Sequence, residues 1–124
     1  LVDYVTKGSN YSTEHYSAVQ ADVPDANDPS TQINVGFLTS LQQADILLIA
    51  GEALSHCVAN TVRDACNFFQ DDSLAKKMVL LEDCTSSVWH PDPNVNQIFQ
   101  DMSVGFLKEM TARGMKVSNT KDFF

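Results

Sequence analysis

The chain has few basic residues and no long apolar run, and both shortages limit what it can do. Lysine and arginine together number 8 among 124 residues, against 16 aspartate and glutamate residues, so the formal net charge is −8. An acidic surface of this kind repels phosphate groups, so we expect neither nucleic acid nor a membrane as a partner. The longest apolar run covers residues 46–50, far below the roughly 20 residues of a membrane-spanning helix.

Cysteine is also scarce, and its spacing argues against two common uses. The three cysteines are Cys57, Cys66 and Cys84, and no CxxC pair is present. Zinc sites built from thiolates usually contain such pairs, and an odd count argues against a disulfide framework. Because residues 1–5 also lack the pattern of a signal peptide, we predict a reducing, cytoplasmic location.

What the chain does have is enough apolar residues, 44%, to build the core of one small domain. The spacing of these residues alternates between the patterns of strands and helices. A long polar loop is predicted over residues 9–30. The predicted strands cover residues 1–6, 44–50, 78–82 and 115–117, and the predicted helices cover residues 31–43, 55–69 and 95–113.

This alternation predicts an α/β fold, with a parallel sheet between helices in a three-layer α/β/α arrangement. Ligands of such sheets bind outside the carboxyl ends of the strands. Lys7, the segment 51–57 and the pair Asp83 and Cys84 each follow a predicted strand. We expect these three positions to meet at one edge of the sheet, although Asp83 could instead only cap the loop that follows it.

Cys57 is the strongest candidate for chemistry. It falls in the first turn of a predicted helix, where free N–H groups and the helix dipole favour an anion and therefore a thiolate. A nearby ammonium group such as that of Lys7 acts in the same direction. The alternatives are that Cys57 is a small buried apolar residue and that Lys7 is a solvated lysine at a strand end.

Other polar and sulfur-containing side chains have structural interpretations. We expect Cys66 and Cys84 to pack in the core, His56 to play a supporting role beside Cys57, and His15 and His90 to be solvated in loops.

Two segments resemble a known family. Residues 44–65 read ADILLIAGEALSHCVANTVRDA, and residues 5–10, VTKGSN, are followed by YSA at residues 16–18. These motifs resemble the nucleophile and lysine regions of the isochorismatase-like cysteine hydrolases, especially the nicotinamidases. Counting the strand that ends at Asp83 and the last predicted helix and strand, the resemblance covers nearly the whole chain.

The resemblance implies a cysteine-dependent amidohydrolase that releases ammonia from a small carboxamide such as nicotinamide. Cys57 matches the nucleophile and Lys7 the lysine that holds the thiolate. The peptide bond between Glu52 and Ala53 is expected to be cis, and the N–H groups of Ala53 and Cys57 to form the oxyanion hole. Tyr16 and Glu52 are expected in the substrate pocket. Glu52 is not the small apolar residue of the family pattern, so N-carbamoyl and ureido compounds remain alternative substrates.

The family's catalytic Asp and its metal ligands lie upstream of the lysine, outside residues 1–124. We therefore expect residues 1–124 to be the C-terminal portion of a single isochorismatase-like domain. This portion is expected to carry no cofactor and to be inactive alone. A divalent metal such as zinc would belong to the N-terminal half, which is the expected partner, and the resemblance also implies a homo-oligomer.

Two rival hypotheses remain from the sequence. The chain could be a non-catalytic remnant of the fold that serves as an interaction or oligomerisation module. It could also be a thiol switch that uses Cys57 with Cys84.

Overall fold

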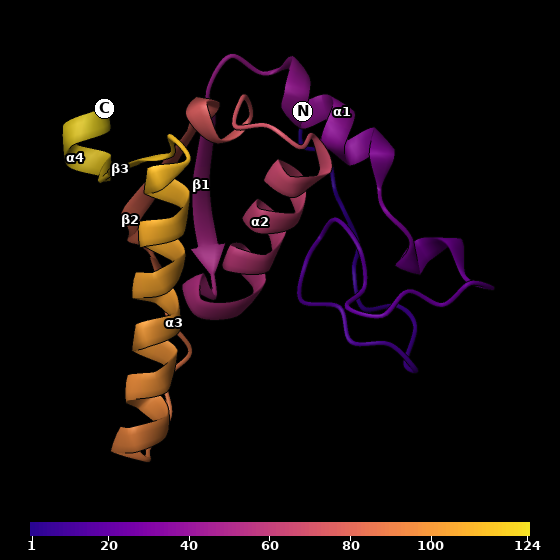
Figure 1. Ribbon diagram of the computed structural model, residues 1–124, viewed down its shortest axis with the longest axis horizontal. Helices are drawn as coiled ribbons and strands as arrows, with labels where there is room; N and C mark the ends of the chain where they lie inside the picture. The colour runs from indigo at the N-terminus through magenta and orange to yellow at the C-terminus, as the bar shows by residue number, and fades with distance from the viewer.

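The computed structural model, which describes all of residues 1–124, is an α/β fold with a three-stranded parallel sheet (Figure 1). The strands are β1 (Leu47–Glu52), β2 (Met78–Ser86) and β3 (Lys116–Ser118). The α-helices are α1 (Val35–Gln43), α2 (Ala59–Phe68), α3 (Pro93–Ala112) and α4 (Thr120–Phe123). Shorter turns are the 3-10 turns η1 (Pro29–Thr31) and η3 (Ala75–Lys77) and the π-helical turn η2 (Leu54–Val58). None of the helices combines the length and apolar character that crossing a membrane requires.

The strands lie in the order β1-β2-β3, and both pairs are parallel. A parallel pair needs a crossover connection, and α2 and α3 supply the two crossovers. Figure 1 shows α2 and α3 next to each other, with the strands behind them. The predicted α/β class with a parallel sheet is therefore confirmed.

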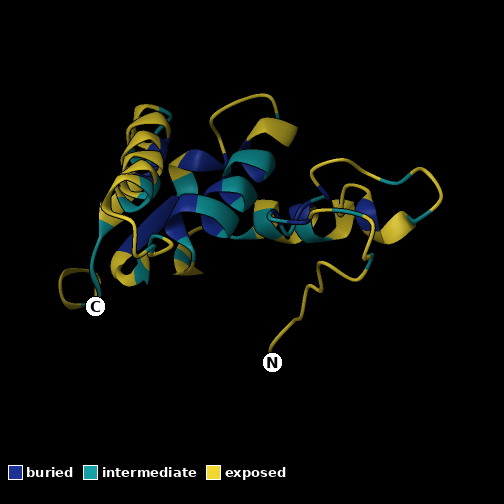
Figure 2. Ribbon diagram, turned by 90° about the horizontal axis from the view of Figure 1, so that it is seen from below, coloured by how far each residue is buried: buried dark blue, intermediate teal, exposed yellow.

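The core forms where the sheet meets these helices, as the buried residues in Figure 2 show. Phe106 and Met110 lie four residues apart on α3, share one helix face and are fully buried. Leu38 adds a buried side chain from α1. The first four residues of β2 are all buried because this strand has a neighbour on either side.

β1 has a partner on one side only, since β2 is its single neighbour in the sheet. Its exposed side chains include Leu48, and Ile46 directly before the strand is also exposed. The outer edge of β1 thus borders a pocket rather than another strand.

The prediction of a strand over residues 1–6 is wrong. These residues have no regular secondary structure and are exposed. Asp3, Tyr4 and Val5 lie against α1, where they line a shallow pocket with residues of that helix. A β-branched and aromatic segment forms a strand only when a neighbouring strand pairs with its backbone, and no strand of the sheet does so here.

The predicted polar loop is an ordered structure without long elements. Its buried residues, among them Val19 and Ala21, connect it to the rest of the molecule. Asp28 caps the turn η1, and the Thr31 hydroxyl donates to the backbone oxygens of Asp25 and Asp28. Asn34 then caps α1 by accepting a hydrogen bond from the N–H of Phe37.

Candidate active site

Cys57 lies in the short connection between β1 and α2. Gly51 adopts a φ of 115°, which glycine tolerates without steric cost, and the peptide bond between Glu52 and Ala53 is cis. The π-helical turn Leu54–Val58 follows, and the backbone oxygen of Ala53 accepts hydrogen bonds from His56 and Val58. The cis bond occupies the position expected from the sequence, and single π-helical turns occur frequently at functional sites.

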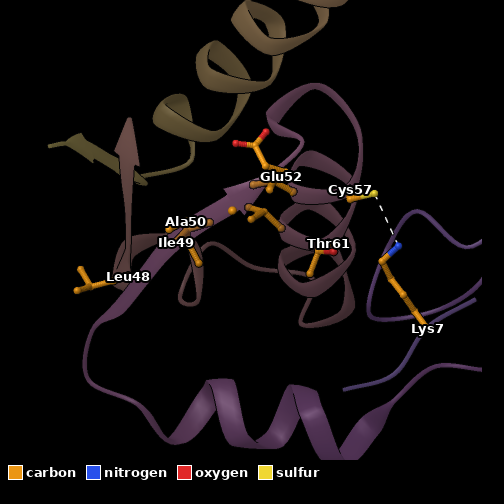
Figure 3. A pocket seen from close by; sticks show the side chains of 10 residues that line it. Lys7, Leu48, Ile49, Ala50, Glu52, Cys57 and Thr61 are labelled. Atoms are coloured by element: carbon orange, nitrogen blue, oxygen red, sulfur yellow. Dashed lines mark hydrogen bonds between the residues drawn. The ribbon is translucent and has the colours of Figure 1, made fainter. Parts of the chain in front are cut away.

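Lys7 lies directly beside Cys57, although 50 positions separate them in the chain. Its Nζ atom is 3.7 Å from Cys57 Sγ and donates a hydrogen bond to it. The same Nζ atom donates to the backbone oxygen of His15 at 2.9 Å. Figure 3 shows the lysine reaching the sulfur from a separate loop. An ammonium group in this position stabilises a thiolate over a thiol.

Both side chains open onto a pocket of about 310 Å³ along the outer edge of β1 (Figure 3). Its lining also includes Ile49, Glu52 and Thr61. The volume falls at the lower end of the range for small-molecule sites, which is roughly 300–1,000 Å³. The pocket is therefore suited to a small ligand placed against the Cys57 sulfur.

Glu52 is the one acidic residue in this lining. Its Oε2 atom accepts a hydrogen bond from the Ser86 hydroxyl at 2.9 Å, which ties the carboxylate to the end of β2. The hydrogen bonds of Cys57 Sγ include none with a carboxylate. Within residues 1–124, then, the thiol has a cationic partner and no acidic one.

The loop that carries Lys7 is fixed to α2 through Thr61. The Thr61 hydroxyl accepts a hydrogen bond from the backbone N–H of Ala18 at 2.9 Å. The next residue, Val19, is buried in the core, and its backbone oxygen accepts from Asn34. The lysine loop is thus fastened to the beginning of α2, directly after the turn that carries Cys57.

Tyr16 and His56 lie near this pocket but do not line it. Their rings pack together with centroids 5.6 Å apart, and the His56 ring also meets Phe99 edge-on at 5.1 Å. His56 Nδ1 is 2.8 Å from the Ser55 hydroxyl, so this nitrogen is engaged away from Cys57. The structure brings Lys7, Glu52 and Cys57 together but leaves Tyr16 outside the lining.

The expected convergence of Asp83 with the other strand ends does not occur. Asp83 accepts hydrogen bonds from the hydroxyl and the N–H of Thr120, which holds α4 against β2. These hydrogen bonds keep the pKa of the Asp83 carboxyl below its usual value. Asp83 is thus a structural residue that fastens the C-terminal segment.

The two other cysteines differ from one another. Cys66 is fully buried in the core as predicted, and burial raises the pKa of its thiol to about 11. Cys84 is exposed, so its predicted packing role is wrong. It lies in the part of β2 beyond the buried residues, because this strand continues to Ser86 rather than ending near residue 82. Local desolvation, followed by the negative charge of Asp83, raises the pKa of Cys84.

A metal site does not fit these residues. No group of three His, Cys, Asp or Glu side chains comes together within residues 1–124.

Two residues of the site were not found from the sequence. His15 was expected to be solvated, yet its side chain is only 8% exposed and adjoins Lys7. Thr61 appeared only as part of the family-like motif, with no role assigned. The signal for both was the short apolar segment at residues 16–19 inside a polar stretch, since an apolar interruption indicates a segment that packs against the core.

Neither a family model nor a curated protein nor a solved structure matches this chain. The resemblance to the isochorismatase-like hydrolases therefore rests on sequence patterns alone.

Proposed function

We propose that the protein is a cysteine-dependent amidohydrolase that releases ammonia from a small carboxamide, nicotinamide being the first to test. The observation that carries this proposal is the 3.7 Å contact between Lys7 Nζ and Cys57 Sγ at the wall of a small pocket. A lysine and a cysteine so far apart in sequence meet there at the carboxyl end of β1, which is the usual ligand-binding end of a parallel sheet. The proposal includes the three-layer fold of the isochorismatase-like family.

In the proposed reaction the Cys57 thiolate attacks the carboxamide carbon. The carbonyl oxygen becomes an oxyanion, and the family resemblance assigns the N–H groups of Ala53 and Cys57 to its stabilisation. The C–N bond then breaks, and the nitrogen takes up a proton and leaves as ammonia. Water attacks the resulting thioester, which gives the carboxylic acid and restores the thiol.

The proton transfers need an acid–base residue that residues 1–124 do not supply at Cys57. Glu52 is the pocket's one carboxylate, and it is bound to Ser86 rather than to the sulfur. We place the general base on polypeptide outside residues 1–124, beside the open edge of β1. This assignment agrees with the family resemblance, in which the catalytic Asp precedes the lysine.

The test is ammonia release from nicotinamide and a panel of small primary carboxamides by residues 1–124 together with the polypeptide that supplies the general base, with the intact masses measured in parallel. We expect Cys57→Ala to abolish turnover and to remove any acyl adduct from the intact mass. Cys84→Ala is the matched control, because that thiol is exposed but lies outside the pocket, and it should retain full activity. Turnover that survives Cys57→Ala would refute the proposal.

One observation favours a second candidate, an interaction module without catalysis. This observation is the absence of a carboxylate partner for Cys57 within residues 1–124. The two candidates differ in thiol reactivity. The module requires no activated thiol, so it predicts that Cys57 reacts with iodoacetamide at pH 7 no faster than the exposed Cys84.

A further inference from the structure

We infer that His15 is a positioning residue that holds Lys7 against Cys57. This inference rests on the proposed function, because it assigns His15 a part in activating the same thiol. His15 is not one of the residues that line the pocket. It contacts the lining residue Lys7, so its effect is exerted through the lysine.

His15 contacts two consecutive residues of the lysine loop. Its backbone oxygen accepts from Lys7 Nζ at 2.9 Å, and its ring Nδ1 accepts from the backbone N–H of Gly8 at 3.2 Å. Gly8 has a φ of 76°, so the chain bends at this residue in a conformation that glycine adopts easily. The bend and the two hydrogen bonds together set the direction in which the lysine side chain leaves the loop.

His15 is itself held rigidly enough to act as a support. Its side chain is 8% exposed. Three residues later the backbone N–H of Ala18 is bound to Thr61 on α2. The lysine loop is therefore held at two points. Ala18 fastens it to α2, and His15 binds Lys7, which in turn contacts Cys57 in the turn before α2.

The hydrogen bonding also defines the form of the His15 ring. Nδ1 accepts a hydrogen bond, so it carries no proton, and the proton of the neutral ring is on Nε2. Nε2 is buried and has no hydrogen-bond partner within residues 1–124. A histidine with no structural role would turn this nitrogen toward water. An unpaired buried nitrogen costs free energy, so we attribute the burial of the ring to its Nδ1 contact with Gly8.

The test compares His15→Leu, which removes the Nδ1 acceptor, with His15→Asn, whose amide oxygen can replace it. The readout is the rate of iodoacetamide alkylation at Cys57 at pH 7, followed by mass spectrometry of the peptide in a Cys84→Ser background. We expect His15→Leu to slow this reaction at least threefold and His15→Asn to restore it to within twofold of the parent. At pH 10, where thiols are ionised without help, the rates of the variants should converge.

A double-mutant cycle separates positioning from general loosening of the fold. If His15 acts through Lys7, His15→Leu should cause no further decrease in the Lys7→Gln background. Circular dichroism checks folding, and His15→Gln replaces His15→Leu if the latter is unfolded. The role of His15 is overturned if His15→Leu leaves the rate unchanged, or if it lowers the rate by the same factor in the Lys7→Gln background as in the parent. Either result leaves the proposed function intact. If Cys57 reacts no faster than Cys84 in the parent protein and Lys7→Gln changes nothing, the proposed function itself fails.

Discussion

Replacing Lys7 by glutamine tests the central contact directly. Two unit charges 3.7 Å apart attract each other by about 1 kcal/mol in the dielectric of water and by about 4–5 kcal/mol at an effective dielectric constant of 20. Lys7 is exposed and Cys57 is half-buried, so the lower value applies. Since about 1.36 kcal/mol corresponds to a factor of ten, losing about 1 kcal/mol of attraction for the reacting sulfur anion should slow its reaction roughly sixfold.

The assay is the second-order rate of iodoacetamide alkylation at Cys57 at pH 7. We expect Lys7→Gln to lower it about sixfold, whereas Lys7→Arg, which keeps the charge, should lower it less. Lys116→Gln removes the same charge from β3, which β2 separates from β1, and should leave the rate unchanged. Equal rates for the parent and Lys7→Gln would show that the contact does not activate the thiol. A decrease in Lys116→Gln of the same size would show that only net charge matters.

Two further predictions concern the supports of the site. Thr61→Val removes the acceptor for the Ala18 N–H, which should lower the free energy of unfolding in urea by about 1–2 kcal/mol and slow alkylation of Cys57. Burial raises the pKa of Cys66 to about 11, above the value of about 8.5 for an unfolded thiol. The folded state therefore favours the protonated thiol, and this contribution is full below pH 8.5 and lost as the pH rises to about 11. Raising the pH from 8 to 10.5 should therefore lower the free energy of unfolding of the parent by on the order of 2 kcal/mol more than it lowers that of Cys66→Ala.

Much of the fold follows from local sequence patterns. The apolar stripe of α3 and the short apolar runs of β1 and β2 are visible as periodicity, and each became the predicted element with changes at its ends. Residues 1–6 show where this reasoning stops. Their composition suits a strand, but a strand also needs a paired neighbour, and pairing is a property of the whole sheet rather than of the segment.

The site was accessible from sequence only in part. Cys57 was identified by its place after a buried strand, which is a local feature. Thr61 acts through a contact with a distant segment, made by the backbone N–H of Ala18. His15 acts within the lysine loop, through its own backbone oxygen on Lys7 and through the backbone N–H of Gly8. Backbone groups carry no sequence signature, so a hydrogen bond to them cannot be predicted from residue types. Asp83 illustrates the opposite error, because the carboxyl end of a strand indicated a pocket where the side chain serves to attach α4.

The open edge of β1 also governs how copies of this polypeptide behave toward each other. A strand edge with unpaired N–H and C=O groups, flanked by exposed apolar residues such as Ile46 and Leu48, is a template on which another strand can add. The net charge of −8 opposes this addition by keeping copies apart. Salt shortens the range of that repulsion, and acidification toward the isoelectric point near 4.5 removes it. Wherever this edge is left uncovered, we therefore expect solubility to rise as the ionic strength falls and as the pH moves above the isoelectric point.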